Sequence, residues 1–542
     1  MKRNLRQKFN IRKTLKTQEI NSPQKTGRFL FLIPLFIGII GFVMLLSSSS
    51  NYGVGISGDS VSYIMWARNF AENFSFSKSD GSSLIILPPF YSISIACFKL
   101  LGMNEFFAAR LISSLSFGLI IFISGLWILR YLGSLLFSII CSILILFSNA
   151  IVPDCCWAWS EPLFIMFVAF FLFLIPRVID NPTFKLTFLL GIITSAACLT
   201  RYIGVALLPV GAFVLFFGIK QLRKKIVFTF FWGIVSLIPF GIWLIRNHIL
   251  SGTFMGVRLS YYSPVFQNIN TAGDTLRSWF IIGAEKYIPG WLFFTLFSIF
   301  VLATLTVYTY KFIKSKETNW AIITVPLFIV SYTTAILYAA INSQLGSFEG
   351  RYLSPLYPAI TMLIAVFAFK LLGSRKKNIR YITIGGIVIG TSIWLFAGFN
   401  YTMATTKHLS KYGFGFASAF WQNSDTIAWL KSNKLNGRIY TNDVWGIYIL
   451  TDINTCMSPS KPKDENPSQK DKTLKEKGLS EFKSVLETEK NVYLVWFARN
   501  IRSYLYVPQQ LQDFCDMRLI ARLNDGYIIQ LYPKNSLHTP AK

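Results

Sequence analysis

The chain has 542 residues, of which 53% are hydrophobic and only 14% are charged. A soluble protein of this length would carry more charge, so the composition excludes that class. The formal net charge is +28, but the basic residues gather between apolar runs, which favours a membrane topology signal over nucleic-acid binding.

The apolar residues form runs of about twenty, the length that carries a helix across roughly 30 Å of hydrocarbon. Such a helix satisfies its own backbone polar groups, as a bilayer requires. The first run is too long for a cleaved signal peptide and lacks a small-residue cleavage site, so we expect a retained helix. Eleven membrane spans are predicted, near residues 29–48, 105–129, 134–152, 161–176, 186–200, 202–218, 226–245, 291–310, 319–341, 352–371 and 381–399.

Basic residues mark every second junction between the predicted spans. Residues 1–28 form a basic tail whose only acid is Glu19, and further clusters surround Lys224 and Lys376. This is the positive-inside pattern. It predicts a multi-pass protein of the cell membrane, most simply a bacterial inner or plasma membrane. The N-terminus is then cytoplasmic, and the chain beyond residue 400 lies outside.

The outward-facing segments predicted by this topology are unequal in length. Residues 29–399 form the transmembrane domain, and its long outer loops are residues 49–104 and 246–290. Within the first loop, Leu87–Leu101 is apolar but too short to span, and it begins with a proline pair suited to a helix start. We interpret it as an amphipathic helix lying in the outer membrane interface.

Residues 400–542 change in character and predict a small α/β domain outside the membrane, because helical and strand patterns alternate. Residues 458–477 are rich in Lys, Pro, Ser and Asp, which is typical of a disordered loop. No glycine-rich phosphate loop precedes a helix here, so no nucleotide cofactor is expected. The predicted fold class is therefore an α-helical polytopic membrane protein with an interfacial helix and an outer α/β domain.

Asp59 is the first candidate for chemistry. It follows the first span in the run Gly53-Val54-Gly55-Ile56-Ser57-Gly58-Asp59-Ser60, which places one carboxylate just above the outer leaflet. A helical pattern follows, so Asp59 could also be an ordinary helix N-cap. The two roles are compatible, and a catalytic role remains the sharper hypothesis.

The second outward turn offers two more carboxylates, Asp154 and Glu161. Glu161 stands at the start of a predicted span, where an ionisable residue is a functional candidate. The alternative is an acid in the first turn of a helix, stabilised by the helix dipole, with Ser160 as the cap. Glu161 is the stronger candidate of the two acids.

Arg201 is the only charge in the tight third outward turn, between two apolar runs. A cation on the outer side needs an anionic partner, and a phosphate matches the guanidinium fork. The alternative is an arginine that reaches to lipid headgroups. Further outer charges complete a face that contains acids and possible phosphate-binding cations: Arg246, Arg258, Arg277, Lys286, Glu349 and Arg351.

An ordered set of loose motifs then resembles the membrane-embedded GT-C glycosyltransferases, over about residues 25–400. The branch it resembles is that of bacterial relatives of protein O-mannosyltransferases and the lipid A aminoarabinose transferase. The motifs are Gly58-Asp59-Ser60, LPPFYSISIACFKLLGMNEFFAARLISSLSFG, Ser160-Glu161-Pro162-Leu163-Phe164, LTRYIGVALLPV, Arg246-Asn247 and RYLSPLYP from Arg351.

The resemblance implies roles for individual residues. The acid of the first outer loop is the catalytic base in this family, which corresponds to Asp59. The acid at the second outer turn lines the site, and Glu161 fits that place better than Asp154. Cations around the lipid phosphate correspond to Arg201 and, more loosely, to Arg246 and Arg351. Some relatives carry Glu or Lys before the proline pair, where this chain has Ile86-Leu87, so a divalent metal is left open.

The implied activity is transfer of a sugar from a polyprenyl-phosphate donor to an acceptor hydroxyl of a protein, lipid or glycan at the outer face. Membrane lipids and the lipid-linked donor are the expected partners, and nucleic acid is not. Two alternatives stay open: a transporter or flippase of lipid-linked saccharides, and a polymerase or ligase of such units. Transporters often have repeated halves with charges near the bilayer centre, whereas the candidates here lie at the outer rim.

Overall fold

A computed structural model describes residues 29–76, 84–256, 264–281, 286–315, 319–342, 350–374, 376–461, 469–500 and 502–535. The chain divides into two compact units. Unit 1 contains residues up to Ser50 and Tyr63–Ser410, and unit 2 contains Asn51–Ser62 and Lys411–Lys542. The segment between the first two helices thus belongs to the same unit as the C-terminal part of the chain. The domain boundary predicted at residue 400 falls within a helix that ends at Tyr412.

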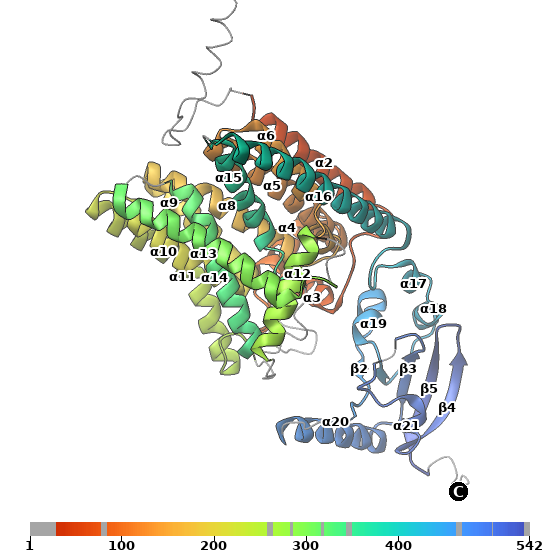
Figure 1. Cartoon of the computed structure of the whole chain (residues 1–542). Helices are drawn as coiled ribbons and strands as arrows, with labels where there is room; N and C mark the ends of the chain where they lie inside the picture. The colour runs from red at the N-terminus through yellow and green to blue at the C-terminus, as the bar shows by residue number, and fades with distance from the viewer. Residues whose placement is uncertain are drawn as a thin grey trace, which may run out of the picture. The chain divides into compact units, whose positions relative to one another are not determined.

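Unit 1 is helical. Its elements, coloured from red to green in Figure 1, are α2 (Leu32–Ser48), α3 (Gly58–Asn73, which begins in unit 2), α4 (Phe90–Leu100), α5 (Glu105–Leu132), α6 (Leu135–Leu146), α7 (Val152–Cys155), α8 (Glu161–Asp180), α9 (Phe184–Thr200), the 3₁₀ helix η1 (Tyr202–Ala206), α10 (Leu207–Gly218), α11 (Leu222–Ser251), α12 (Val265–Phe280), α13 (Gly290–Ser315), α14 (Trp320–Asn342), the 3₁₀ helix η2 (Gly350–Tyr352), α15 (Leu356–Leu372) and α16 (Lys377–Tyr412).

Each of the eleven predicted spans coincides with a helix. Within the described residues, six helices are long and apolar enough to cross a membrane: α5, α8, α11, α13, α14 and α16. The other predicted spans coincide with shorter apolar helices, and α4, expected to lie in the interface, is shorter still. The protein is therefore a multi-pass membrane protein.

The span predicted to reach residue 152 is interrupted. Helix α6 ends at Leu146, because Ser148 Oγ accepts hydrogen bonds from the N–H groups of Ala150 and Ile151. Such a side-chain contact competes with helical backbone bonding. The short helix α7 then begins at Val152.

Helix α5 is the centre of one group of packed helices, with α2, α6, α8 and α15 against it. The contact with α2 is made through glycines. A Cβ added to Gly38 would lie 2.6 Å from the carbonyl oxygen of Gly118. Small residues are what allow helix backbones to approach this closely in a membrane.

Unit 2 is built on a five-stranded sheet in the order β2-β1-β3-β5-β4. Strands β1 and β2, and β1 and β3, are parallel, whereas β5 is antiparallel to β3 and β4. The elements, blue in Figure 1, are α17 (Ala419–Gln422), α18 (Asp425–Ser432), β1 (Arg438–Thr441), α19 (Val444–Thr451), β2 (Cys456–Met457), α20 (Gln469–Thr488), β3 (Val492–Phe497), α21 (Pro508–Leu511), β4 (Cys515–Arg522) and β5 (Gly526–Pro533).

The loop predicted over residues 458–477 differs from the structure at its end. Residues 462–468 lie outside the described part, but helix α20 already begins at Gln469. Lysine, glutamate and leucine are good helix formers even where few residues are apolar. Later in the same helix, Phe482 and Leu486 are buried against the sheet. Tertiary packing therefore stabilises a helix whose first part has the composition of a disordered loop.

Candidate functional site

Glu161 is the centre of an ionic cluster in unit 1. It is the first residue of α8, after the tryptophan-rich turn that leads to Ser160. Its side chain is only 2% exposed, and its Oε1 lies 2.7 Å from Nη1 of Arg201. Helices α8 and α9 pack together, which brings the start of one to the end of the other.

Arg201 follows the last residue of α9, where the backbone turns to an extended conformation. Its Nη1 also donates to Ser160 Oγ at 3.2 Å, and that oxygen is 2.9 Å from the hydroxyl of Tyr63. The turn requires Gly204, because a Cβ there would lie 2.7 Å from the backbone of Ala197. Burial, the largest single influence, lowers the pKa of Arg201, but the Glu161 carboxylate together with Tyr63 and Tyr332 outweighs it, so that the pKa is raised.

Arg351 is the second cation of the cluster. Its Nη1 lies 3.8 Å from Glu161 Oε1, and its guanidinium stacks over the Trp159 ring at 4.7 Å. Trp159 in turn stacks on Trp157 with the ring planes 8° apart. The 3₁₀ helix η2 places this arginine, and the carbonyl of Arg351 accepts from Ser354 Oγ. A stacked guanidinium of this kind has a fixed orientation.

Asp154, in the short helix α7, is the second carboxyl of the cluster and is buried. Burial, reinforced by the negative charge of Glu161, raises its pKa to about 8. Asp154 Oδ2 has no hydrogen-bond partner among the described residues. At neutral pH Asp154 is therefore mostly protonated and neutral.

The cluster consequently carries a net positive charge. Two guanidinium groups face one charged carboxylate, and the side chains of Arg201 and Arg351 remain 20% and 17% exposed. Glu161 is held inside by both cations, whereas part of each cation is open. An anion with several acceptor oxygens, such as a phosphate, is the complementary ligand.

Arg246 makes different contacts. On α11, its Nη1 donates to the carbonyl of Leu84 at 2.7 Å, its Nη2 donates to the carbonyl of Phe76 at 3.4 Å, and its guanidinium stacks on Trp243 at 4.5 Å. Tyr202 adds a bond from its hydroxyl to the carbonyl of Ile85. These contacts fasten the segment predicted as the first outer loop to α11.

Asp59 belongs to unit 2, at the second position of α3, and its side chain is exposed. The capping bonds of α3 are made by two serines. The Ser57 N–H donates to Ser60 Oγ at 3.0 Å, and the Ser60 N–H donates to Ser57 Oγ at 3.4 Å. This reciprocal pair is a capping box built from serines. The start of α3 is thus capped by Ser57 and Ser60, whereas the sequence had suggested Asp59 as an alternative cap.

The remaining sequence candidates are dispersed. Arg258 and Glu349 lie outside the described residues, and Lys286 is exposed after α12. Arg277 is buried and pairs with Asp274 at 2.8 Å. Within the described part, no three His, Cys, Asp or Glu side chains form a metal-ligand group, and the divalent metal that the sequence left open stays an open question for experiment.

Sequence reasoning missed the polar and aromatic neighbours of the cluster, namely Tyr63, Ser160 as a hydrogen-bond relay, Trp159 and Ser354. Ser160 and Trp159 adjoin Glu161 in the sequence, so the tryptophan-rich turn was the available signal. Tyr63 and Ser354 come from distant segments, and their contribution depends on the packing of helices that spacing alone does not reveal.

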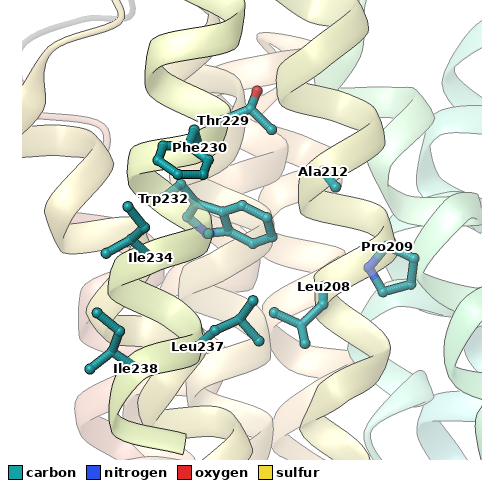
Figure 2. Close-up of a pocket in the computed structure, with 10 residues that line it drawn as sticks. Leu208, Pro209, Ala212, Thr229, Phe230, Trp232, Ile234, Leu237 and Ile238 are labelled. Carbon is teal, nitrogen blue, oxygen red and sulfur yellow. The ribbon is translucent and has the colours of Figure 1, made fainter. Parts of the chain in front are cut away.

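Two of the apolar cavities in the described part of unit 1 lie between helices away from the ionic cluster. One of about 600 Å³ lies between α10 and α11. Figure 2 shows Trp232 and Leu237 of α11 pointing toward Leu208 on α10. The other, of about 700 Å³, is lined by α6, α13, α15 and α16. Neither is lined by a candidate ionisable residue, so both are distinct from the cluster.

The comparisons with known proteins show the fold. No protein-family profile and no curated protein sequence matches this chain. ArnT from Cupriavidus metallidurans bound to undecaprenyl phosphate is similar in structure, with a TM-score of 0.59, 12% identity and coverage of 93% of this chain and 99% of that chain. In the apo state it gives a TM-score of 0.58 at 12% identity, over 91% of this chain and 97% of that chain.

A second similar protein is the oligosaccharyltransferase AglB from Archaeoglobus fulgidus, in complex with an inhibitory peptide and a dolichol-phosphate. Its TM-score is 0.54 at 11% identity, over 95% of this chain and 76% of that chain. The chain therefore shares its fold with ArnT and AglB. At these identities the likeness concerns the fold, and chemistry has to be argued from the site.

Proposed function

We propose that this protein is a membrane glycosyltransferase that moves a sugar from a polyprenyl-phosphate donor to an acceptor hydroxyl at the outer face of the membrane. The observation that carries the proposal is the cluster of Arg201, Arg351 and Glu161. It presents two partly exposed guanidinium groups around one buried carboxylate. A lipid phosphate is an anion that reaches such a site from within a membrane.

The cluster has a catalytic use as well as a binding use. As the bond between the sugar and the phosphate breaks, the departing phosphate gains negative charge. The two cations would stabilise that charge more strongly than the ground state, which is how electrostatic groups accelerate a reaction. Glu161 keeps the guanidinium groups oriented before the substrate binds, because it is nearly inaccessible and paired with both.

Asp59 is proposed as the general base. The acceptor oxygen forms a bond to the anomeric carbon, the bond from that carbon to the phosphate oxygen breaks, and the hydroxyl proton passes to the Asp59 carboxylate. Support comes from its position after the first span, as in the family it resembles, and from the serine pair that caps α3. Its side chain is exposed and able to meet an acceptor.

The structural neighbours support the class of donor. One solved structure of ArnT contains undecaprenyl phosphate, and the AglB complex contains dolichol-phosphate. Both ligands join a phosphate to a long isoprenoid, and the proposal gives this chain a partner of the same chemistry. The transmembrane helices would admit the isoprenoid from the bilayer while the cluster holds the phosphate.

The test uses the purified full chain in lipid nanodiscs and two readouts. The first is the binding of undecaprenyl phosphate. The second is the transfer of a tritium-labelled sugar from its undecaprenyl-phosphate carrier to water, which serves as the acceptor hydroxyl and leaves undecaprenyl phosphate and free sugar. Asp59→Asn should preserve binding within about twofold and lower this transfer about 100-fold or more, because an amide cannot accept the proton. Asp513→Asn, at an exposed carboxylate of the same unit, is the matched control.

Asp59→Asn with most of its transfer activity would remove Asp59 as the base. If undecaprenyl phosphate bound the Arg201→Ala, Arg351→Ala double variant as well as it bound the wild type, the cluster would not be the phosphate site. A protein that moves the labelled lipid between leaflets without releasing its sugar would instead be a transporter.

A further inference from the structure

The segment that carries Asp59 is fastened to the C-terminal part of the chain within unit 2. Ile56 forms a parallel bridge with Gly415. The Ile56 N–H donates to the carbonyl of Phe414 at 3.4 Å, and the Phe416 N–H donates to the carbonyl of Ile56 at 2.8 Å. Val54 and Ile56 are buried. Three residues before Asp59, the backbone is therefore fixed by pairing with residues more than 350 positions later.

A second contact lies at the residue next to Asp59. Gly58 faces the indole ring of Trp445, and a Cβ added to Gly58 would lie 3.5 Å from Cδ2 and 3.6 Å from Cε2 of that ring. These are ordinary van der Waals distances, so the ring supports the first turn of α3 from one side. Because Asp59 directly follows Gly58, the position of its backbone depends on where Trp445 stands.

Trp445 is itself held by a charged side chain from the loop that follows β3. The guanidinium of Arg502 lies 5.0 Å from its ring centroid, and Arg502 Nη2 donates to Asp443 Oδ2 at 3.3 Å. Asp443 caps α19 through the N–H of Gly446 at 3.0 Å and also accepts from Asn500. Asp443 follows β1 and Arg502 follows β3, so two adjacent parallel strands orient the tryptophan from the same end of the sheet.

We infer that Trp445 is a positioning residue for Asp59, and that the C-terminal α/β domain serves the reaction by holding the proposed base in place. This inference rests on the proposed function, since it needs Asp59 to be the base. It assigns the domain a task beyond the capture of an acceptor. A misplacement of about 1 Å at a reacting group can lower a rate about 100-fold, so a contact next to the base is sufficient to matter.

The contacts from Arg502 through Trp445 to Gly58 predict what removal of the tryptophan ring should do. Loss of the ring should loosen residues 54–60 and slow turnover, while the phosphate cluster of unit 1 keeps its own contacts. The effect should therefore appear in kcat and not in donor affinity. A phenylalanine retains an aromatic face for Gly58 and for Arg502, so it should recover much of the rate.

The experiment compares the wild type with Trp445→Ala, Trp445→Phe and Trp429→Ala in the full chain. Trp429 is a half-buried tryptophan on α18 of the same unit and serves as the control. Hydrogen exchange followed by mass spectrometry reports on residues 54–60 and, as a check of the fold, on β3. Undecaprenyl phosphate affinity and transfer of the tritium-labelled sugar from its lipid carrier to water complete the set.

For Trp445→Ala we expect exchange at residues 54–60 to rise at least tenfold, kcat to fall at least tenfold, and undecaprenyl phosphate affinity to stay within twofold. Trp445→Phe should recover most of both changes, and Trp429→Ala should show neither. Unchanged exchange at residues 54–60, or faster exchange with unchanged kcat, overturns the positioning role. Faster exchange in β3 of Trp445→Ala would mean that the variant has disturbed the fold of the sheet. The positioning role is then tested with Trp445→Phe, which keeps an aromatic ring, and with Arg502→Lys, which keeps a cation.

Failure of the proposed function has a different signature. If Asp59→Asn turns over normally in the same assay, the assignment of the base is wrong whatever Trp445 does. If Asp59→Asn is inactive and Trp445→Ala is as active as the wild type, only the positioning role is lost.

Discussion

Arg201 follows the last residue of α9, and Glu161 is the first residue of α8, the helix before it; Arg201 Nη1 and Glu161 Oε1 are 2.7 Å apart. The sequence suggested a phosphate as the partner of Arg201, and the structure shows that the Glu161 carboxylate is a second partner. The two are compatible, since the guanidinium has five N–H donors. Glu161 orients the arginine and leaves donors for a ligand.

Arg201→Ala should weaken undecaprenyl phosphate binding on the order of tenfold to 100-fold, because a charge-assisted hydrogen bond contributes about 1.5–3 kcal/mol. It also leaves Glu161 with a weaker partner in a buried place, which destabilises the fold. The double variant Arg201→Ala, Glu161→Gln removes that poorly compensated charge. We expect it to regain thermal stability but not affinity, measured in the same nanodiscs. Regained affinity would mean that Arg201 acts on structure alone.

The raised pKa of Asp154 predicts a pH dependence of donor binding. From about pH 8 upward the carboxyl ionises, and the cluster loses its net positive charge. Affinity for undecaprenyl phosphate should therefore fall as pH rises through 8, although the phosphate is already fully ionised there, since its second pKa is about 6. Asp154→Asn should abolish the fall. The measurement is undecaprenyl phosphate binding from pH 6.5 to 9.5. An equal fall in affinity in the wild type and in Asp154→Asn would show that Asp154 is not the group responsible.

Asp154 should also make the stability of the folded protein fall as pH rises, as it does for donor binding. The folded protein retains the Asp154 proton between the ordinary carboxyl pKa near 4 and the folded value of about 8. The unfolded chain releases it over this range, so this residue lowers stability as pH rises from about 4 to 8. Asp154→Asn should flatten that part of a melting-temperature profile.

Arg246 is predicted to act on the first outer loop. Since its guanidinium donates to the carbonyls of Leu84 and Phe76, Arg246→Ala should speed amide exchange at residues 84–86 by tenfold or more. Undecaprenyl phosphate affinity should change less than threefold. A tenfold loss of affinity with unchanged exchange would make Arg246 a phosphate ligand instead.

Helix α20 is predicted to be essential to the stability of unit 2. Phe482 is 1% exposed and packs edge-on against Tyr440, with the ring centroids 4.9 Å apart. Phe482→Ala should lower the free energy of unfolding by about 3–5 kcal/mol and speed exchange in β3. Glu487→Ala, on the exposed side of the same helix, is the control, and equal effects of the two variants would contradict this packing.

The topology stays a prediction of the charge pattern. In a variant without the exposed Cys97, Lys224→Cys should react with a membrane-impermeant maleimide only after the cells are opened. Asn270→Cys should react in intact cells. The reverse pattern would place the ionic cluster on the cytoplasmic side.

Much of the fold follows from local pattern. Apolar runs marked the helices of unit 1, and the succession of helical and strand patterns over residues 400–542 marked the α/β domain, because both signals are contained within short windows of sequence. The helical start of α20 did not follow, since its lysine-rich sequence lacks an apolar face until Leu479. The pairing of Ile56 with Gly415 could not follow either, because nothing within a short window indicates a partner so far along the chain.

The candidate site divides in the same way. The charges at Glu161 and Arg201 stood out because a bilayer makes charges near spans rare. Their pairing, the addition of Arg351 and the burial of Asp154 depend on how α8, α9 and η2 meet. The sequence offered Arg246 as a looser counterpart of Arg201, and the contacts of each guanidinium show that Arg246 holds a loop whereas Arg201 is a candidate phosphate ligand.

The glycine contact between α2 and α5 has a consequence for biosynthesis. Gly38 and Gly118, whose backbones touch, are separated by 80 residues of chain. At about 5–20 residues per second, a ribosome needs roughly 4–16 s to make the second after the first. If α2 is the membrane span predicted for residues 29–48, its glycine face is without its α5 partner for those seconds, and a chaperone or insertase that shelters a small-residue face would act in that interval.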